Sequence, residues 1–231
     1  MEAKQYLVFN CETTGLNPTR DQICHLSYII LDDMFNPLIA KKFYFSVNHM
    51  SYGAMGVHGL TREALQELSS GKEFKDCYRE IYEDFKSVDL IATHNLSFFW
   101  DFMLCEFQRL DVFEEDFRNV QKMCLMWVYK DVLKLEWSDY ILDYKYPRFS
   151  EIERFLELKR EDIIEQSEGL FNLEEGEITR CISKTTSAAQ MLKVYMLKEI
   201  EIFWCKKQIK IKEIYQIMWK KTPSKFRRSQ I

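Results

Sequence analysis

Several features that would indicate a membrane, secreted or zinc-ribbon protein are missing from the sequence. No apolar run reaches the roughly 18 residues of a membrane span, and the first residues carry Glu2 and Lys4 without a signal-type apolar block. The seven cysteines form no Cys-x-x-Cys pair. We therefore expect reduced thiols, no membrane contact, and a cytoplasmic location, or a nuclear one if the source is eukaryotic.

Two residue types that perform hydrolytic chemistry are absent from the C-terminal part of the chain. No histidine follows His94, and no aspartate follows Asp162. A catalytic site that needs either residue late in the chain must therefore do without it.

Length and charge suggest one domain with an extension. The 231 residues, 47% of them hydrophobic, are enough for one sizeable core. Residues 206–231 contain nine Lys or Arg against Glu213 alone, a net charge of +8, which leaves −12 for residues 1–205. We predict a domain over 1–205 and a basic extension over 206–231, helical at first and then flexible. The extension either contacts phosphate or an acidic protein partner, or is simply solvated.

Hydrophobic patterning predicts an α/β arrangement. Strands are expected at residues 5–10, 22–31, 38–46, 89–93 and 120–126. Helices are expected at residues 61–69, 74–85, 98–110 and 149–158, and from about residue 186 through Ile200 and Phe203 toward Pro223. The first three strands have short connections and should form an antiparallel meander, so the complete sheet should be mixed.

The most informative segment is residues 7–16, Leu-Val-Phe-Asn-Cys-Glu-Thr-Thr-Gly-Leu. Its apolar start predicts a buried strand, and Gly15 allows a sharp turn or a close approach by a ligand. Asn10 and Glu12 are two residues apart, so their side chains leave the same face of a strand. Two carboxylates there could hold a divalent cation, but only Glu12 is anionic.

This segment resembles the first motif of the DEDDh (DnaQ-like) 3′–5′ exonucleases, in which a strand ends in Asp-x-Glu-Thr-Thr-Gly-Leu. The match runs from Glu12 to Leu16, and Asn10 stands where the family has its leading carboxylate. The resemblance implies a ribonuclease-H-like fold, with a mixed five-stranded sheet flanked by helices. It also implies that Thr13, Gly15 and Leu16 line a nucleotide pocket.

Later segments extend the resemblance over roughly residues 5–200. Residues 57–61, Val-His-Gly-Leu-Thr, resemble a family segment beside the terminal nucleotide, so His58 and Leu60 would line the pocket; alternatively His58 is a helix-entry residue. Residues 92–95, Ala-Thr-His-Asn, resemble the second motif and place Asn95 at the nucleotide. Asp101 would be that motif's metal ligand, although it follows Asn95 by six residues rather than about four, or it is a helix N-terminal acid. Residues 146–158 resemble a family helix and add only fold information.

The family's third motif, His-x-Ala-x-x-Asp, is missing. Alignment of the last core helix puts Ile182 at the histidine and Ser187 at the aspartate. Of the four carboxylates that hold two metal ions in the family, the chain retains Glu12 and, through the second motif, Asp101. Loss of a general base alone lowers a rate by about 10²–10⁴-fold. Binding of Mg²⁺ or Mn²⁺ would therefore be weak or vestigial.

These residues favour a catalytically inactive exonuclease-fold protein. It would bind a single-stranded nucleic acid 3′ end, or act as a scaffold that recruits a protein partner through the basic extension. The alternative is an active metal-dependent 3′–5′ exonuclease with relocated ligands. In that case Glu174, Glu175 or Glu177 supplies a missing metal ligand, or Asn10 is an engineered substitution. A weaker idea is a polymerase accessory subunit, and the sequence does not distinguish DNA from RNA.

Overall fold

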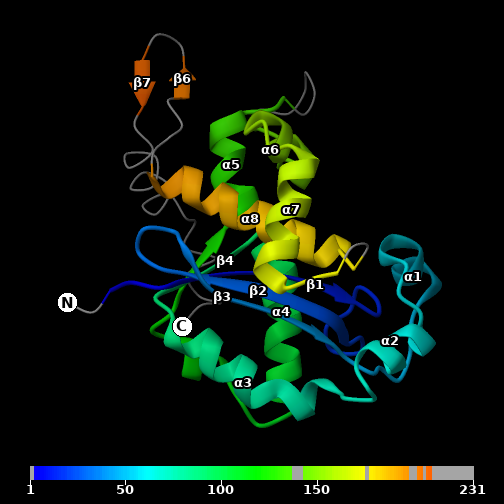
Figure 1. The fold of residues 1–231 in the computed structure, drawn as a ribbon. Helices are drawn as coiled ribbons and strands as arrows, with labels where there is room; N and C mark the ends of the chain where they lie inside the picture. The colour runs from blue at the N-terminus through cyan, green and yellow to red at the C-terminus, as the bar shows by residue number, and fades with distance from the viewer. Residues whose placement is uncertain (1–2, 137–142, 175–176, 198–201, 205–206, 210–231) are drawn as a thin grey trace.

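The computed structural model describes residues 3–136, 143–174, 177–197, 202–204 and 207–209. Its centre is a five-stranded sheet in the order β3-β2-β1-β4-β5 (Figure 1). The strands are β1 (Tyr6–Thr13), β2 (Ile23–Leu31), β3 (Pro37–Tyr44), β4 (Leu90–Thr93) and β5 (Gln121–Cys124). β1, β2 and β3 pair antiparallel, whereas β4 runs parallel to both β1 and β5. The predicted mixed five-stranded sheet is confirmed.

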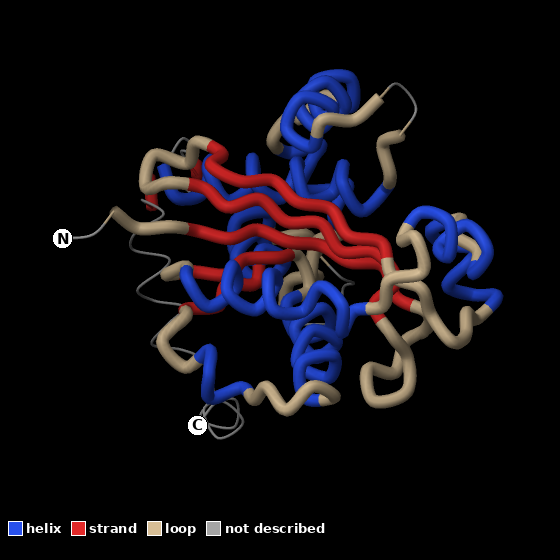
Figure 2. The backbone as a smooth tube through the Cα atoms, turned by 60° about the horizontal axis from the view of Figure 1, so that its bottom comes forward, coloured by secondary structure: helices blue, strands red, loops and turns tan. Residues whose placement is uncertain are grey.

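Helices cover both faces of this sheet (Figures 1 and 2). One face is covered by α3 (Phe74–Ser87) and α4 (Leu96–Gln108), with the short 3-10 helix η1 (Glu114–Phe117) nearby. The other face is covered by α5 (Leu125–Leu133), α6 (Phe149–Phe155), α7 (Arg160–Phe171) and α8 (Arg180–Leu197). Two small helices, α1 (Tyr52–His58) and α2 (Arg62–Leu68), lie at one end of the sheet. None of the described helices is long and apolar enough to cross a membrane.

The central strand β1 is buried on both faces, and its side chains alternate between two cores. Leu7, Phe9 and Cys11 pack with α3 and α4. Tyr6 and Val8 pack into the core beneath α5 and α8. Because side chains alternate along a strand, Asn10 and Glu12 continue the α8-facing row. The apolar row thus turns polar where β1 ends.

The predicted elements are largely confirmed, with differences at their ends. β1 extends to Thr13 and α4 begins at Leu96, two residues before its predicted start. The segment 120–126 contains a strand only to Cys124, after which α5 begins. The helices α1, α5 and α7 were not predicted.

The last core helix differs most from expectation. It begins at Arg180, six residues before the predicted Thr186, and ends at Leu197. Its first turns contain hydroxyl residues, which interrupt the apolar period in the sequence. One of them, Thr185, is accommodated in the helix because its hydroxyl donates to the Cys181 carbonyl over 3.0 Å. A two-stranded ladder, β6 (Ile202–Trp204) with β7 (Lys207–Ile209), follows where helix was predicted. The predicted boundary at 205/206 and the helix toward Pro223 lie outside the described residues.

Candidate functional site

A buried polar cluster occupies the end of β1 beneath α8. Asn10 is 5% exposed and faces Ser27 of β2, while Glu12 is 9% exposed and faces His25. Asn10 Nδ2, Glu12 Oε1 and both ring nitrogens of the fully buried His25 have no hydrogen-bond partner. Burial lowers the pKa of His25 to about 3. Native interiors rarely leave several polar atoms unpaired in one place, which makes this cluster a candidate functional site.

The start of α8 brings positive charge to this cluster. Arg180 Nε lies 3.8 Å from Glu12 Oε1, and another guanidinium nitrogen donates to the Val57 carbonyl over 2.9 Å. Lys184 follows one helical turn later. Its pKa is lowered, mainly by burial and to a smaller extent by the charge of Arg180. The side chains that α8 presents to Glu12 are therefore cationic.

A cavity of about 1260 Å³ opens beside Glu12. It brings together five of the predicted site residues: Glu12, Thr13, Gly15, Leu16 and His58. Leu16 is 83% exposed, and a His58 ring nitrogen lies 3.3 Å from the Thr13 carbonyl. The structure thus brings these five residues to one cavity around the first motif.

Two of the predicted nucleotide contacts are not among the residues that line this cavity. Leu60 packs against a small cluster of Cys24, Val47 and Leu65. Asn95 takes a left-handed conformation, φ 61°, as the N-cap of α4. The structure therefore does not bring either residue to the cavity with Glu12.

Asp101 also lies away from the cavity. It is exposed on α4, and its pKa is raised by burial and by the charge of Glu114. Phe98 and Phe99 line the cavity instead. Since α4 begins at Leu96, Asp101 is rotated by roughly 200° from Phe99 around the helix axis. The structure therefore does not bring Asp101 to Glu12.

The residues aligned with the third motif are placed elsewhere too. Ile182 is buried in the main core, and Ser187 donates to Glu153 Oε1 over 2.8 Å. The helix α8 begins at Arg180, six residues before its predicted start, and its first turns place Arg180 and Lys184 beside Glu12. Their spacing of four residues would have indicated one helix face if the helix start had been located.

The glutamates that were candidates to restore a metal site do not do so among the described residues. Glu177 Oε2 lies 3.4 Å from Lys42 Nζ and accepts the backbone N–H of Glu174 over 3.1 Å. Both glutamates are exposed, and neither lines the cavity. Glu175 lies outside the described residues.

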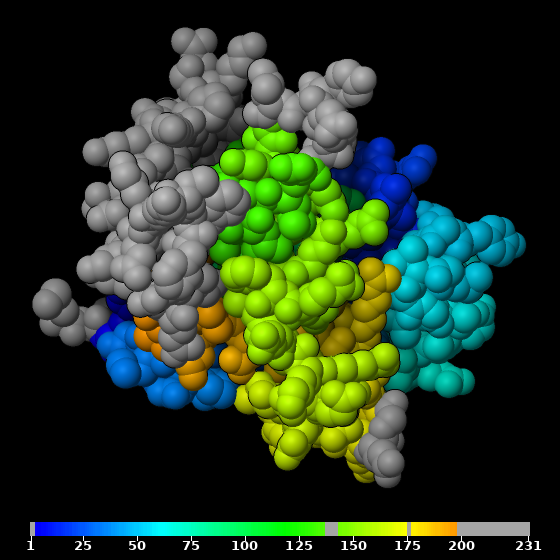
Figure 3. Space-filling view, turned by 90° about the horizontal axis from the view of Figure 1, so that it is seen from above, coloured from blue at the N-terminus to red at the C-terminus, as the bar shows by residue number. Residues whose placement is uncertain are grey.

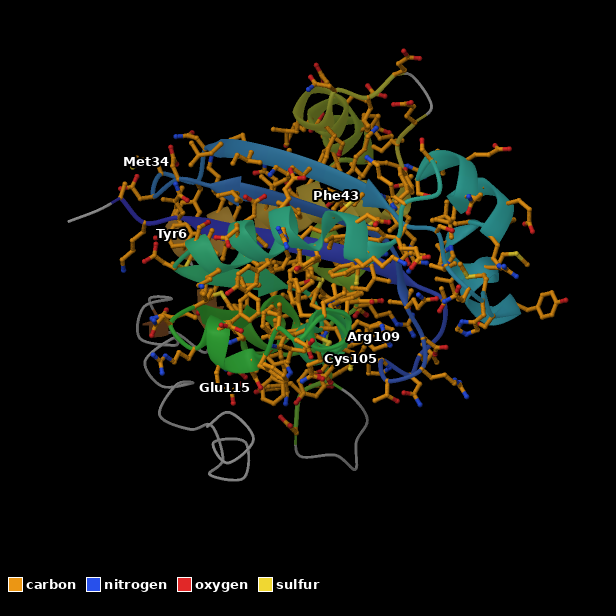
Figure 4. All side chains as sticks on the ribbon, turned by 90° about the horizontal axis from the view of Figure 1, so that it is seen from below. Tyr6, Met34, Phe43, Cys105, Arg109 and Glu115 are labelled. Carbon is orange, nitrogen blue, oxygen red and sulfur yellow. The ribbon has the colours of Figure 1, made fainter. Side chains whose placement is uncertain are left out.

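The loop after β1 is fixed by a carboxylate that sequence reasoning missed. Asp21 is 1% exposed, accepts the Asn17 N–H over 2.8 Å and lies 2.8 Å from His49 Nε2. Arg109 donates to the Asp21 carbonyl over 3.0 Å, and Figure 4 shows it at the end of α4 beside this loop. Gly15 passes so close that a Cβ there would lie 2.3 Å from Asp21 Oδ2. Gly15 was expected to allow a sharp turn or a close approach by a ligand; in the structure it is the Asp21 side chain that approaches it.

A second cavity of about 770 Å³ lies on the other side of α8's first turns. His94, Arg148 and Arg160 line it, together with Arg180 and Lys184 of the first cavity. His94 Nε2 lies 3.0 Å from the Pro147 carbonyl, and burial lowers its pKa.

The donor set does not fit a divalent metal ion. No group of three or more His, Cys, Asp or Glu in the described part of the chain could hold one. Glu12 faces the guanidinium of Arg180 rather than a second carboxylate. Hard cations need several anionic oxygens, which this arrangement does not provide.

Comparisons with known proteins agree with this fold. A family profile described as Exonuclease (RNase_T) matches residues 7–148, so the chain belongs to this exonuclease family. Solved structures of exonuclease I share its fold. A complex with the inhibitor BCBP has TM-score 0.64 and 16% identity over 86% of this chain and 42% of that one. The Escherichia coli enzyme with a dT13 oligonucleotide has TM-score 0.62 and 15% identity over 83% of this chain and 40% of that one. This chain thus spans about two fifths of the length of those proteins, and no curated protein matches it.

Proposed function

We propose that this chain is a catalytically inactive member of the exonuclease family that binds the 3′ end of a single-stranded nucleic acid. The observation that supports this most directly is the charge beside Glu12. Asn10 replaces one carboxylate, and Arg180 lies 3.8 Å from the remaining one. Two-metal hydrolysis requires carboxylates in these places, so binding is favoured over cleavage.

The cavity itself suits a nucleotide. Leu16, Phe98 and Phe99 supply apolar and aromatic surface beside Glu12, and His58 adds a polar ring. Stacking of bases on such side chains is typical of proteins that bind single strands without strong sequence preference. Structures of exonuclease I with dT13 and 5cy-dA13 oligonucleotides show that fold relatives bind single-stranded DNA. We further propose that the basic extension over residues 206–231 adds phosphate or partner contacts outside this cavity.

The test combines binding with cleavage. Fluorescence anisotropy with 5′-labelled single-stranded DNA and RNA should give saturable binding, and Leu16→Ala with His58→Ala should abolish it. Leu38→Ala is the matched control, because Leu38 is 51% exposed on β3, away from the cavity. Unchanged affinity in the cavity variant would refute the nucleic-acid function.

Cleavage decides between a binder and a working enzyme. Oligonucleotides labelled at the 3′ end are incubated with Mg²⁺, with Mn²⁺ and with chelator. We expect no trimming by wild type. Trimming that is lost in Glu12→Gln would overturn the proposal and establish the alternative, an active 3′–5′ exonuclease with relocated ligands. Trimming only by Asn10→Asp would identify Asn10 as the inactivating residue.

A further inference from the structure

Arg180 and Lys184 line both cavities, so the two cavities meet at the start of α8. Residues four apart lie on one face of a helix. Glu12 lines the first cavity but not the second, and Arg148 and Arg160 line the second but not the first. Figure 3 shows the golden start of α8 between the yellow-green α6–α7 region and the cyan α1–α2 region. A single strand that enters the first cavity therefore meets this pair of cations before it reaches the second.

The acids of both cavities are too few or too engaged to neutralise these cations. In the first cavity, Glu12 lies 3.8 Å from Arg180, and Asp21 is already bound by His49 and the Asn17 N–H. These two acids face four cationic side chains in the same lining, Arg20, Arg109, Arg180 and Lys184. In the second, Glu153 accepts the Ser187 hydroxyl and is the acid that lines a wall containing Arg148, Arg160, Arg180 and Lys184. The wall shared by the two cavities therefore carries an excess of positive charge.

Arg180 retains donors for a ligand. Its guanidinium has five N–H groups, and the hydrogen bond recorded for it uses one, to the Val57 carbonyl. Its distance of 3.8 Å from Glu12 Oε1 is longer than a hydrogen bond. Lys184 is half-buried, and a phosphate beside it would favour its charged form. A guanidinium and an ammonium one helical turn apart are both groups that bind phosphate.

We propose that Arg180 and Lys184 bind backbone phosphates of the strand directly, so that binding needs no divalent metal, and that the strand continues toward Arg148 and Arg160. This rests on the proposed binding function. In a metal-dependent relative, cations held by carboxylates neutralise the phosphate; here positive side chains supply that charge themselves. The ligand class is a phosphodiester or a terminal phosphate.

The decisive measurement is anisotropy of a 5′-fluorescein oligothymidylate in chelator and in Mg²⁺. Wild-type affinity should agree within about twofold in the two buffers. Arg180→Gln with Lys184→Met, which retains much of the side-chain bulk, should lower affinity by at least about tenfold, since two charge-assisted hydrogen bonds are lost. The slope of log affinity against log salt should shrink by about 1.4, the value for two phosphates of a single strand. Thermal melting of each variant checks that it is folded.

Matched variants and ligands assign the effect. Lys75→Gln with Arg79→Gln removes two exposed cations of α3, on the opposite face of the sheet, and should leave affinity unchanged. Arg148→Gln with Arg160→Gln should weaken long oligonucleotides and spare a dinucleotide. Oligonucleotides ending in 3′-hydroxyl or 3′-phosphate, with inorganic phosphate as competitor, distinguish a terminal phosphate from an internal one.

The outcomes separate this inference from the proposed function. Two results would overturn the proposed phosphate contacts of Arg180 and Lys184 alone. One is binding that requires Mg²⁺; the other is binding that survives Arg180→Gln with Lys184→Met but is lost on substitution of Leu16 and His58. Absence of any binding by wild type would overturn both.

Discussion

Gly15→Ala should destabilise the fold strongly, because the new methyl group has no room. An added Cβ would lie 2.3, 2.5 and 2.8 Å from Oδ2, Cγ and Oδ1 of Asp21. That carboxylate cannot move freely, since it accepts the Asn17 N–H and pairs with His49, each over 2.8 Å. Overpacking costs about 1–3 kcal/mol, and weakening a hydrogen bond to a charged group costs about 1.5–3 kcal/mol more. We expect a total loss of about 3–5 kcal/mol.

Urea unfolding followed by tryptophan fluorescence measures this loss, and a double-mutant cycle with Asp21→Ala tests its cause. If the clash is the reason, the double variant should be more stable than the sum of the single effects by at least about 1.5 kcal/mol. Gly169→Ala is the matched control: Gly169 is exposed in α7 with nothing within 4 Å of its added Cβ, so alanine should stabilise by about 0.5–1 kcal/mol. Additive losses in the cycle, within about 0.5 kcal/mol, would refute the reasoning.

Two further predictions concern buried ionisable groups. His25 has a folded-state pKa of about 3, below its ordinary value of 6.5, so its neutral form contributes stability above pH 6.5 that is lost as the pH falls toward 3. Between pH 7.5 and pH 5, wild type should lose about 2 kcal/mol more than His25→Phe in urea unfolding, and equal losses would contradict the pKa. Glu106 is 4% exposed, accepts the Ile23 N–H over 2.8 Å and pairs with Arg109 over 2.9 Å. Glu106→Ala should cost about 2–4 kcal/mol, because it leaves the buried Ile23 N–H unpaired and removes the carboxylate that pairs with the exposed Arg109. Glu106→Gln retains an acceptor and should cost less than half as much; similar losses for both would show that the hydrogen bond is unimportant.

The centre of the sheet was predictable because β1 and β2 are long, largely apolar runs. Every residue of β1 and β2 is buried, so each strand appears in the sequence as a continuous run of mostly apolar residues, which is typical of a strand covered on both faces. The helix α1 was missed for the opposite reason. It has no buried residue and contains Gly53 and Gly56, both poor helix formers, so neither periodicity nor propensity indicates it. It forms because Ser51 caps its start and Gly59 ends it.

The sequence predicted the part of the candidate site that β1 and the loop after it contribute, but not the part that α8 contributes. Glu12 and Leu16 could be placed because the first motif is contiguous along the chain and its geometry is local. Arg180 and Lys184 belong to a helix start hidden by hydroxyl residues, and their proximity to Glu12 depends on tertiary packing that no local pattern reports. Asp101 was the nearest aspartate after Asn95, although it follows by six residues rather than about four; the residue four after Asn95 is Phe99, and Phe99 lines the cavity instead.

The position of β1 also dictates when the cavity can form during synthesis. β1 pairs with β4 across 84 residues and contacts α8 across 171. At roughly 5–20 residues per second, β1 leaves the ribosome roughly 10–30 s before α8 does. We expect its apolar end to join β2 early, while Asn10 and Glu12 remain hydrated until α8 docks. A nascent chain can therefore have a nearly complete sheet, and most of the cavity lining, before α8 adds the two cations Arg180 and Lys184.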